Sequence, residues 1–156
     1  MKIEIYAYAV VIAAAALLTS CGEIQVMKTP DSFARFDREK DFRAASADGV
    51  MMKTYEVSGR DVDAKTDEKT WVDEMERTLV SKGYVSLSRK EISVGGTRKG
   101  LFREYTVIYN GENYMYSFVL VKKESRLYIA EMGGPEKAYK EKKDLMTGSL
   151  NTWVIP

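Results

Sequence analysis

The stretch that decides the fold is LFREYTVIYNGENYMYSFVLV, residues 101–121, in which two β-prone segments flank one turn. Asn110-Gly111 is the strongest short signal for a tight hairpin, because both residues tolerate the positive φ angles of a type I′ turn. The segment after the turn, residues 114–121, is almost wholly apolar, which is typical of a strand covered on both faces. We therefore predict an antiparallel hairpin at the centre of a sheet.

Toward the carboxyl end, residues 127–132 form the next predicted strand, after a short Lys-Glu-Ser turn. Gly133-Gly134-Pro135 is expected to end that strand and to open a last helix, with proline at the first helical position. The residues that give this helix its apolar side are Tyr139, Met146, Leu150 and Trp153.

Toward the amino end, residues 84–92 form a further strand, and a helix is predicted from Thr66 or Asp67 to Lys82. Either of the first two residues can cap the helix, and Gly83 is placed to close it. The apolar stripe of this helix consists of Trp71, Val72, Met75 and Leu79.

Two strands precede this helix, residues 42–47 and 50–57, and Asp48-Gly49 between them is another hairpin signal. The expected order is ββαββββα, an α+β fold with a mostly antiparallel sheet and helices packed on it. We expect a single hydrophobic core. Its predicted members are Trp71, Leu79, Phe118, Leu120, Ile129, Tyr139 and Leu150.

The start of the chain has the pattern of a secretory leader. Residues 5–18 are uncharged, and the run is short for a permanent membrane span but fits the apolar part of a cleaved signal. Leu18-Thr19-Ser20-Cys21 follows and resembles the lipobox of bacterial lipoprotein precursors. That resemblance implies cleavage before Cys21 and lipid attachment to it. The alternatives are an ordinary signal peptide with a chance cysteine, or a short uncleaved anchor helix.

The predicted organisation is a signal peptide at residues 1–20, a lipidated tether at 21–31 and a single α+β domain at 32–156. Gly22 after the cysteine is not an aspartate. By the sorting convention of this class, that favours the outer membrane, facing the periplasm.

Four groups of residues carry a second resemblance. They are Thr29-Pro30-Asp31-Ser32-Phe33, then Asp41-Phe42-Arg43 through Asp48-Gly49-Val50, then Trp71 with Leu79 and Lys82-Gly83-Tyr84, and last Gly133-Gly134-Pro135 with Tyr139. Together they resemble the PsbP-like fold, which is named for an extrinsic protein of photosystem II and is shared with DcrB-like bacterial lipoproteins. The resemblance implies an α/β/α sandwich with helices on both sheet faces. It implies no active site, because those relatives act mainly as binding or assembly factors.

Composition excludes several kinds of chemistry. The chain has no histidine, so it lacks the commonest general base and the commonest zinc ligand. Its single cysteine cannot form an internal disulfide. The formal net charge of +1 argues against a general nucleic-acid binder.

Two weak motifs have plainer explanations. Asp61, Asp63 and Asp67 offer oxygen ligands that calcium prefers, but Lys65, Thr66 and Val72 stand where an EF-hand needs other residues. A polar loop that caps a helix explains the aspartates. Gly133-Gly134-Pro135 could present backbone amides to an anion, but it lacks the residues of a P-loop, and a turn explains it.

Glu104 and Glu131 are the candidate catalytic pair, since both lie inside predicted strands with apolar neighbours. Two carboxylates on a shared sheet face could act as acid and base if burial separated their pKa values. The simpler interpretation is a salt bridge for each, with Arg103 close at hand.

Tyrosines and lysines offer two further candidates. The tyrosines of the three central strands could line a ligand cleft, or they could simply fill the core. They are Tyr105, Tyr109, Tyr114, Tyr116 and Tyr128. Lysines of the last helix could contact anionic headgroups, although interleaved Glu136, Glu141 and Asp144 favour a mixed solvated face. These lysines are Lys137, Lys140, Lys142 and Lys143.

The sequence therefore predicts a lipid-anchored cell-envelope protein that binds or assembles with a partner, without metal or cofactor. Its membrane contact would be through lipidated Cys21, with an envelope protein as partner and no nucleic acid. The alternative is a small envelope enzyme that uses carboxylates alone, for example on a glycan. That alternative requires two carboxylates roughly 5–10 Å apart in a groove.

Overall fold

The computed structural model describes residues 26–36, 41–58 and 65–156. In chain order the elements are β1 (Phe33–Arg35), β2 (Arg43–Ser46), β3 (Met51–Ser58), α2 (Glu68–Ser81), β4 (Val85–Val94), β5 (Arg98–Tyr109), β6 (Glu112–Lys123), β7 (Arg126–Pro135) and α3 (Glu136–Leu150). The predicted order is confirmed, with the short strand β1 in addition. No helix in the described part of the chain has the length and apolar character needed to cross a membrane.

The described strands form one seven-stranded sheet in the order β1-β2-β3-β7-β6-β5-β4. All neighbouring strands are antiparallel. The central hairpin is as predicted: Asn110 and Gly111 have φ angles of 49° and 79° and connect β5 to β6. Strand β7 returns beside β6 and pairs with β3 on its other edge, so it joins the two halves of the sheet.

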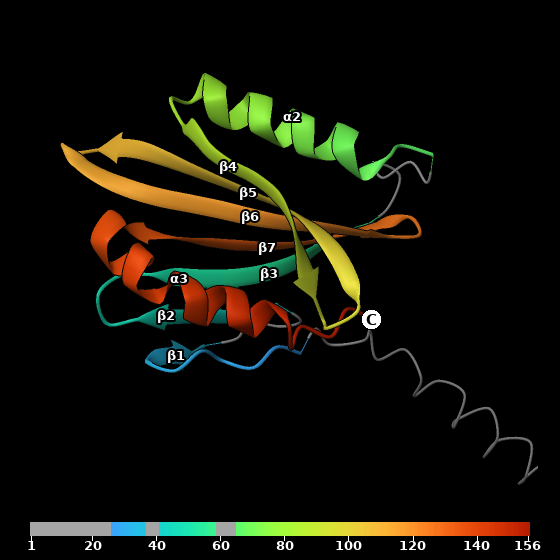
Figure 1. Cartoon of the computed structure of the whole chain (residues 1–156), viewed down its shortest axis with the longest axis horizontal. Coiled ribbons are helices and arrows are strands. Elements are labelled where there is room, and N and C mark those ends of the chain that lie inside the picture. The colour runs from blue at the N-terminus through green and yellow to red at the C-terminus, as the bar shows by residue number, and fades with distance from the viewer. Residues whose placement is uncertain (1–25, 37–40, 59–64) are drawn as a thin grey trace, which may run out of the picture.

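Helices cover both faces of the sheet, α2 on one and α3 on the other (Figure 1). This gives two hydrophobic clusters where the sequence predicted one, because alternate residues of each strand point to opposite faces. Phe118 and Leu120 of β6 lie in the α2-side cluster, whereas Val119 and Val121 lie in the α3-side cluster.

The predicted core residues divide between these clusters. Tyr139 and Leu150 belong to the α3 side, together with Trp153 and Phe42. Ile129 belongs to the α2 side with Phe118 and Leu120, while Trp71 and Leu79 pack against that cluster only partly buried.

The end of β7 differs from the prediction. The strand continues through Gly133 and Gly134, and Pro135 is the residue before the helix instead of its first member. The neighbouring backbone explains both glycines. A Cβ on Gly134 would lie 2.9 Å from the Val50 Cα in the turn before β3, and a Cβ on Gly133 would lie 3.2 Å from the Met115 carbonyl oxygen of β6. The glycines therefore permit close approach within the sheet.

The amino-terminal tether is shorter than predicted. Val26 forms an antiparallel bridge with Val154, and Met27 is buried in the α3-side cluster. The predicted tether, residues 21–31, thus belongs to the domain from residue 26 onward. The predicted lipobox, Leu18–Cys21, lies outside the described residues.

Candidate functional site

Helix α2 is capped as predicted, but little of it is fully buried against the sheet. The Asp67 side chain accepts a hydrogen bond from the Thr70 amide at 2.7 Å, and the Glu68 carboxylate accepts one from the Lys122 amide of β6 at 2.5 Å. Within this helix, all of which the structure describes, Val72 is the only fully buried residue. The helix is therefore tied to β6 at its first turn, and the other residues of its apolar stripe, Trp71, Met75 and Leu79, pack on the sheet only partly buried.

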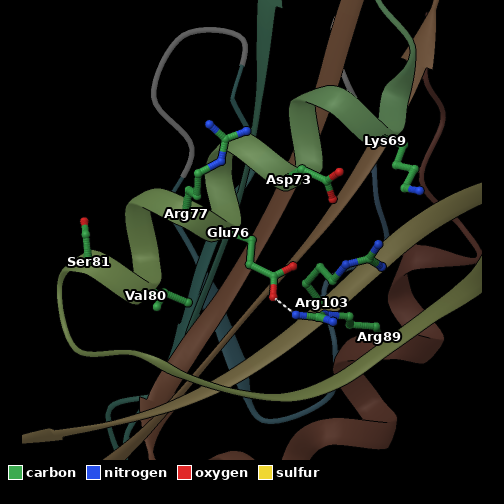
Figure 2. Close-up of a pocket in the computed structure, with 8 residues that line it drawn as sticks. All are labelled: Lys69, Asp73, Glu76, Arg77, Val80, Ser81, Arg89 and Arg103. Carbon is green, nitrogen blue, oxygen red and sulfur yellow. Dashed lines mark hydrogen bonds and ion pairs between the residues drawn. The ribbon is translucent and has the colours of Figure 1, made fainter.

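One flank forms a hollow of about 600 Å³ between α2 and strands β4 and β5, which we name the charged groove. Its lining residues are Lys69, Asp73, Glu76, Arg77, Val80, Ser81, Arg89 and Arg103. In Figure 2, Glu76 points from the helix toward Arg89 and Arg103 on the strands, while Arg77 extends the opposite way. Four basic and two acidic side chains give this groove a surplus of positive charge.

The floor of the charged groove holds two arginines side by side. Arg89 of β4 and Arg103 of β5 are directly opposite each other in the strand register, an arrangement that is unfavourable for like charges. Glu76 neutralises Arg89 through an ion pair. No carboxylate of a described residue pairs with Arg103, whose Nη1 donates instead to the Phe102 carbonyl oxygen at 2.9 Å.

Two buried donors in this region have no acceptor among the described residues. One is the Nε of Arg103 and the other is the hydroxyl of Tyr105, two residues further along the same strand face. Tyr105 is fully buried. Burial and, to a lesser extent, the Glu76 charge raise the pKa of its hydroxyl to about 12, although the charges of Arg103 and Arg89 oppose this shift. An unpaired buried donor is costly, so these groups are suited to an acceptor from outside the chain.

The sequence did not single out this groove. From the sequence, Arg103 is expected only as a salt-bridge partner for Glu104, but neighbouring residues on a strand point to opposite faces. The available signal was the alternation of Leu101, Arg103 and Tyr105, which places a cation among residues of the α2-side face.

Glu104 and Glu131 do not share a sheet face, so the alternative interpretation as a catalytic pair lacks the geometry that it required. Glu104 lies toward α3, where Lys143 Nζ is 2.6 Å from its Oε1. Glu131 lies toward α2 and accepts a hydrogen bond from the Tyr55 hydroxyl at 2.7 Å, with Lys53 Nζ 2.8 Å away. Each carboxylate has its own cation, as the simpler interpretation expected, although neither cation is Arg103.

The tyrosines of the central strands divide between core and surface. Tyr105 and Tyr128 are fully buried, Tyr128 in the α3-side cluster. The other three tyrosines line a hollow of about 440 Å³ near the hairpin end of the sheet, together with Tyr84 and a floor of Gly133 and Gly134. They are Tyr109, Tyr114 and Tyr116. Part of the set thus lines a hollow, and the rest fills the core.

The lysines of α3 take part in a mixed charged face. Lys140 pairs with Glu136 at 2.6 Å, Lys142 pairs with Asp48, and Lys143 pairs with Glu104. Lys137 is exposed. Lys137 and Lys140 thus agree with the mixed solvated-face interpretation, whereas Lys142 and Lys143 are partly buried and pair with acids of other elements.

Of the three aspartates considered as calcium ligands, one has the capping role that the plainer explanation expected. Asp67 caps α2, and Asp61 and Asp63 lie outside the described residues. No group of three acidic, histidine or cysteine side chains suited to a metal ion occurs within ranges 26–36, 41–58 and 65–156.

Comparisons with known proteins identify the fold. No protein-family model matches the chain, and no curated protein sequence matches it. Among solved structures, LpqN of Mycobacterium tuberculosis, involved in cell envelope biogenesis, has a TM-score of 0.56 at 8% identity, covering 86% of this chain and 84% of LpqN. CyanoP, the PsbP of Synechocystis sp. PCC 6803, has a TM-score of 0.53 at 12% identity, covering 90% and 99%.

A third similar structure is PA94 of Pseudomonas aeruginosa, a protein of unknown function, with a TM-score of 0.50 at 12% identity, covering 88% of this chain and 87% of PA94. Likenesses at these identities concern the fold. The chain has the PsbP-like α/β/α architecture that its sequence predicted.

Proposed function

We propose that this chain is a cell-envelope lipoprotein, anchored through Cys21, that acts by binding a partner or ligand and not by catalysis. The observation that carries the proposal is the charged groove, lined by Arg103, whose buried Nε has no acceptor among the described residues. The Tyr105 hydroxyl, on the same strand face, is buried without an acceptor as well. Such a site is equipped to hold a ligand. Glu104 and Glu131, the candidate acid and base, are paired with separate lysines on opposite faces.

The placement in the envelope rests on different support. Leu18-Thr19-Ser20-Cys21 resembles a lipobox, and Gly22 favours the outer membrane on its periplasmic side. The same fold occurs in LpqN, a protein involved in cell envelope biogenesis. Two or more acyl chains on one residue would hold the domain stably at a membrane and raise its effective concentration toward partners there.

Cell fractionation tests the anchor. Cys21→Ser should move the protein from the membrane fraction to the soluble fraction, or leave the leader uncleaved, and should abolish labelling by radioactive palmitate. Thr19→Ser, which keeps the small residue before the cleavage site, is the matched control and should behave as the natural chain. Normal processing and membrane retention of Cys21→Ser would refute the anchor.

Site-specific photo-crosslinking in cells tests the binding role. A photoreactive residue in place of Val80, at the rim of the charged groove, should yield a discrete adduct, whereas one in place of Val154 should not. These valines are comparably exposed, at 53% and 59%. The Val80 adduct should weaken when Cys21→Ser releases the domain. Turnover of an envelope glycan or peptide by the purified mature chain, lost in Glu104→Gln or Glu131→Gln, would overturn the binding proposal.

A further inference from the structure

We propose that the charged groove binds its ligand through one oxyanionic group, a carboxylate or a phosphate, held by Arg103 and Lys69 with the Tyr105 hydroxyl as an additional donor. This inference rests on the proposed binding function and names the ligand chemistry of the same site. The argument uses the strand register, the unpaired donors and the balance of charge in the groove.

The strand register creates a positive charge that the chain neutralises only in part. Arg89 and Arg103 are directly opposite on neighbouring strands, and the Glu76 carboxylate is bound to Arg89. Arg103 has no carboxylate partner among the described residues and makes one hydrogen bond to a backbone carbonyl. An anion beside Arg103 would therefore relieve the repulsion between the two guanidinium groups.

The unpaired donors indicate which groups such an anion would accept hydrogen bonds from. The Arg103 Nε is buried without an acceptor, and the Tyr105 hydroxyl lies on the same strand face, also buried without one. A guanidinium presents parallel N–H groups that match two oxygens of a carboxylate or a phosphate. In the proposed complex, one oxyanion accepts from Arg103 in a bidentate manner and from the tyrosine hydroxyl.

The acidic residues of the groove limit how much negative charge it accepts. Asp73 is exposed on α2 and lines the same hollow, with no ion-pair partner among the described residues. Its carboxylate repels an anion at Arg103. Lys69, one turn before Asp73, supplies the opposing positive charge at the same end of the helix. Removal of the Asp73 charge should strengthen anion binding, whereas removal of a groove donor should weaken it.

The test follows the Nε–H resonance of Arg103 by NMR in the mature chain, purified in a neutral sugar-based detergent that contributes no oxyanion. Sodium acetate and inorganic phosphate are the probes, with sodium chloride at equal ionic strength as the control. Saturable shifts with acetate or phosphate, beyond those with chloride, are expected. Equal responses to all three salts would overturn the proposal.

Three variants establish where the anion binds, with backbone amide shifts of β4 and β5 as the readout. Tyr105→Phe should weaken binding about tenfold, the usual effect of losing one hydrogen bond to a charged group. Asp73→Asn should strengthen binding about threefold, as expected for removing one exposed like charge. Glu141→Gln, an equal charge change on the exposed side of α3, should have no effect. Unchanged affinity in both groove variants would refute the assignment.

A further titration separates the sources of the oxyanion. Vesicles of neutral phosphatidylcholine, with and without anionic phosphatidylglycerol, replace the salts. A response to the anionic vesicles alone assigns the group to a lipid headgroup, and a response to phosphate or acetate assigns it to a small ligand. No response to any oxyanion refutes this inference, even where the Val80 adduct still forms and upholds the binding function.

Discussion

Replacing Gly100 of β5 by alanine should reveal how tightly the α3-side cluster is packed. A Cβ at this position would lie 2.6 Å from Val119 Cγ1 and 2.8 Å from Val94 Cγ2. Distances this short cannot persist, and both valines are fully buried. The added methyl group must therefore displace two core side chains that already fill their space.

The expected cost follows from two opposing effects. Inserting a methyl group into a packed core costs about 1–3 kcal/mol, while replacing glycine by alanine recovers about 0.4–1 kcal/mol from the unfolded chain. Gly100→Ala should thus lower the free energy of unfolding by about 1–2 kcal/mol. Gly148→Ala is the matched control, because Gly148 lies in α3 with open space around its Cα, and it should raise stability by about 0.5–1 kcal/mol.

A double-mutant cycle identifies the clashing partner. Val119→Ala alone should cost about 2 kcal/mol, and together with Gly100→Ala the total should be smaller than the sum by about 1 kcal/mol or more, because the two changes compensate in volume. Urea denaturation followed by circular dichroism measures all four free energies of unfolding. Additive costs within about 0.3 kcal/mol would refute the packing argument.

Three further predictions concern α2 and the tyrosines. Asp67→Ala should cost about 1 kcal/mol by urea denaturation, because it removes the cap on the Thr70 amide; a cost near zero would contradict the cap. Val72→Ala and Trp71→Ala should each lower the free energy of unfolding by about 2 kcal/mol. The valine is small but fully buried, whereas the tryptophan is large but only partly buried. A loss of about 3–5 kcal/mol for the tryptophan variant would mean that its side chain is fully buried against the sheet. The Tyr105 hydroxyl has a pKa of about 12 in the folded chain and of about 10 in the unfolded chain. The free energy of unfolding should therefore keep its full value below about pH 10 and decrease as the pH rises toward 12. Tyr105→Phe should reduce this alkaline slope at little cost at pH 7, and an unchanged slope would exclude Tyr105 as its source.

Local signals predicted most of the elements correctly. Asn110-Gly111 identified the central hairpin, and Asp67 identified the start of α2, because turn and cap chemistry depends on a few adjacent residues. The predicted strand end at Gly133 and Gly134 is wrong. In isolation they resemble a turn, but they lie inside β7, where the backbone at Val50 and at Met115 comes too close for a side chain. That requirement arises from distant segments and cannot be deduced from local sequence.

The candidate site likewise depends on contacts between residues that are not neighbours in the sequence. The pairing of Arg89 with Arg103 follows from the register of β4 and β5, which a bulge shifts between Ser86 and Ser88. Sequence alternation predicted the face of each residue but not this offset. The catalytic hypothesis failed for a simpler reason, since Glu104 and Glu131 are separated by two strand pairings whose register places them on opposite faces.

The position of β7 between β3 and β6 determines how the chain can fold. Tyr55 and Glu131, which touch across that junction, are 76 residues apart in the sequence, so the sheet is completed by closing a long loop. Until residues 126–135 are available, β3 and β6 each keep an open edge, and the domain cannot form step by step from its amino end. Folding should be slow for a chain of this size, because such distant pairings must form before they stabilise anything. A chain whose two half-sheets are joined so late cannot complete its fold while most of it is being made, and an incompletely folded polypeptide can still be threaded through a membrane.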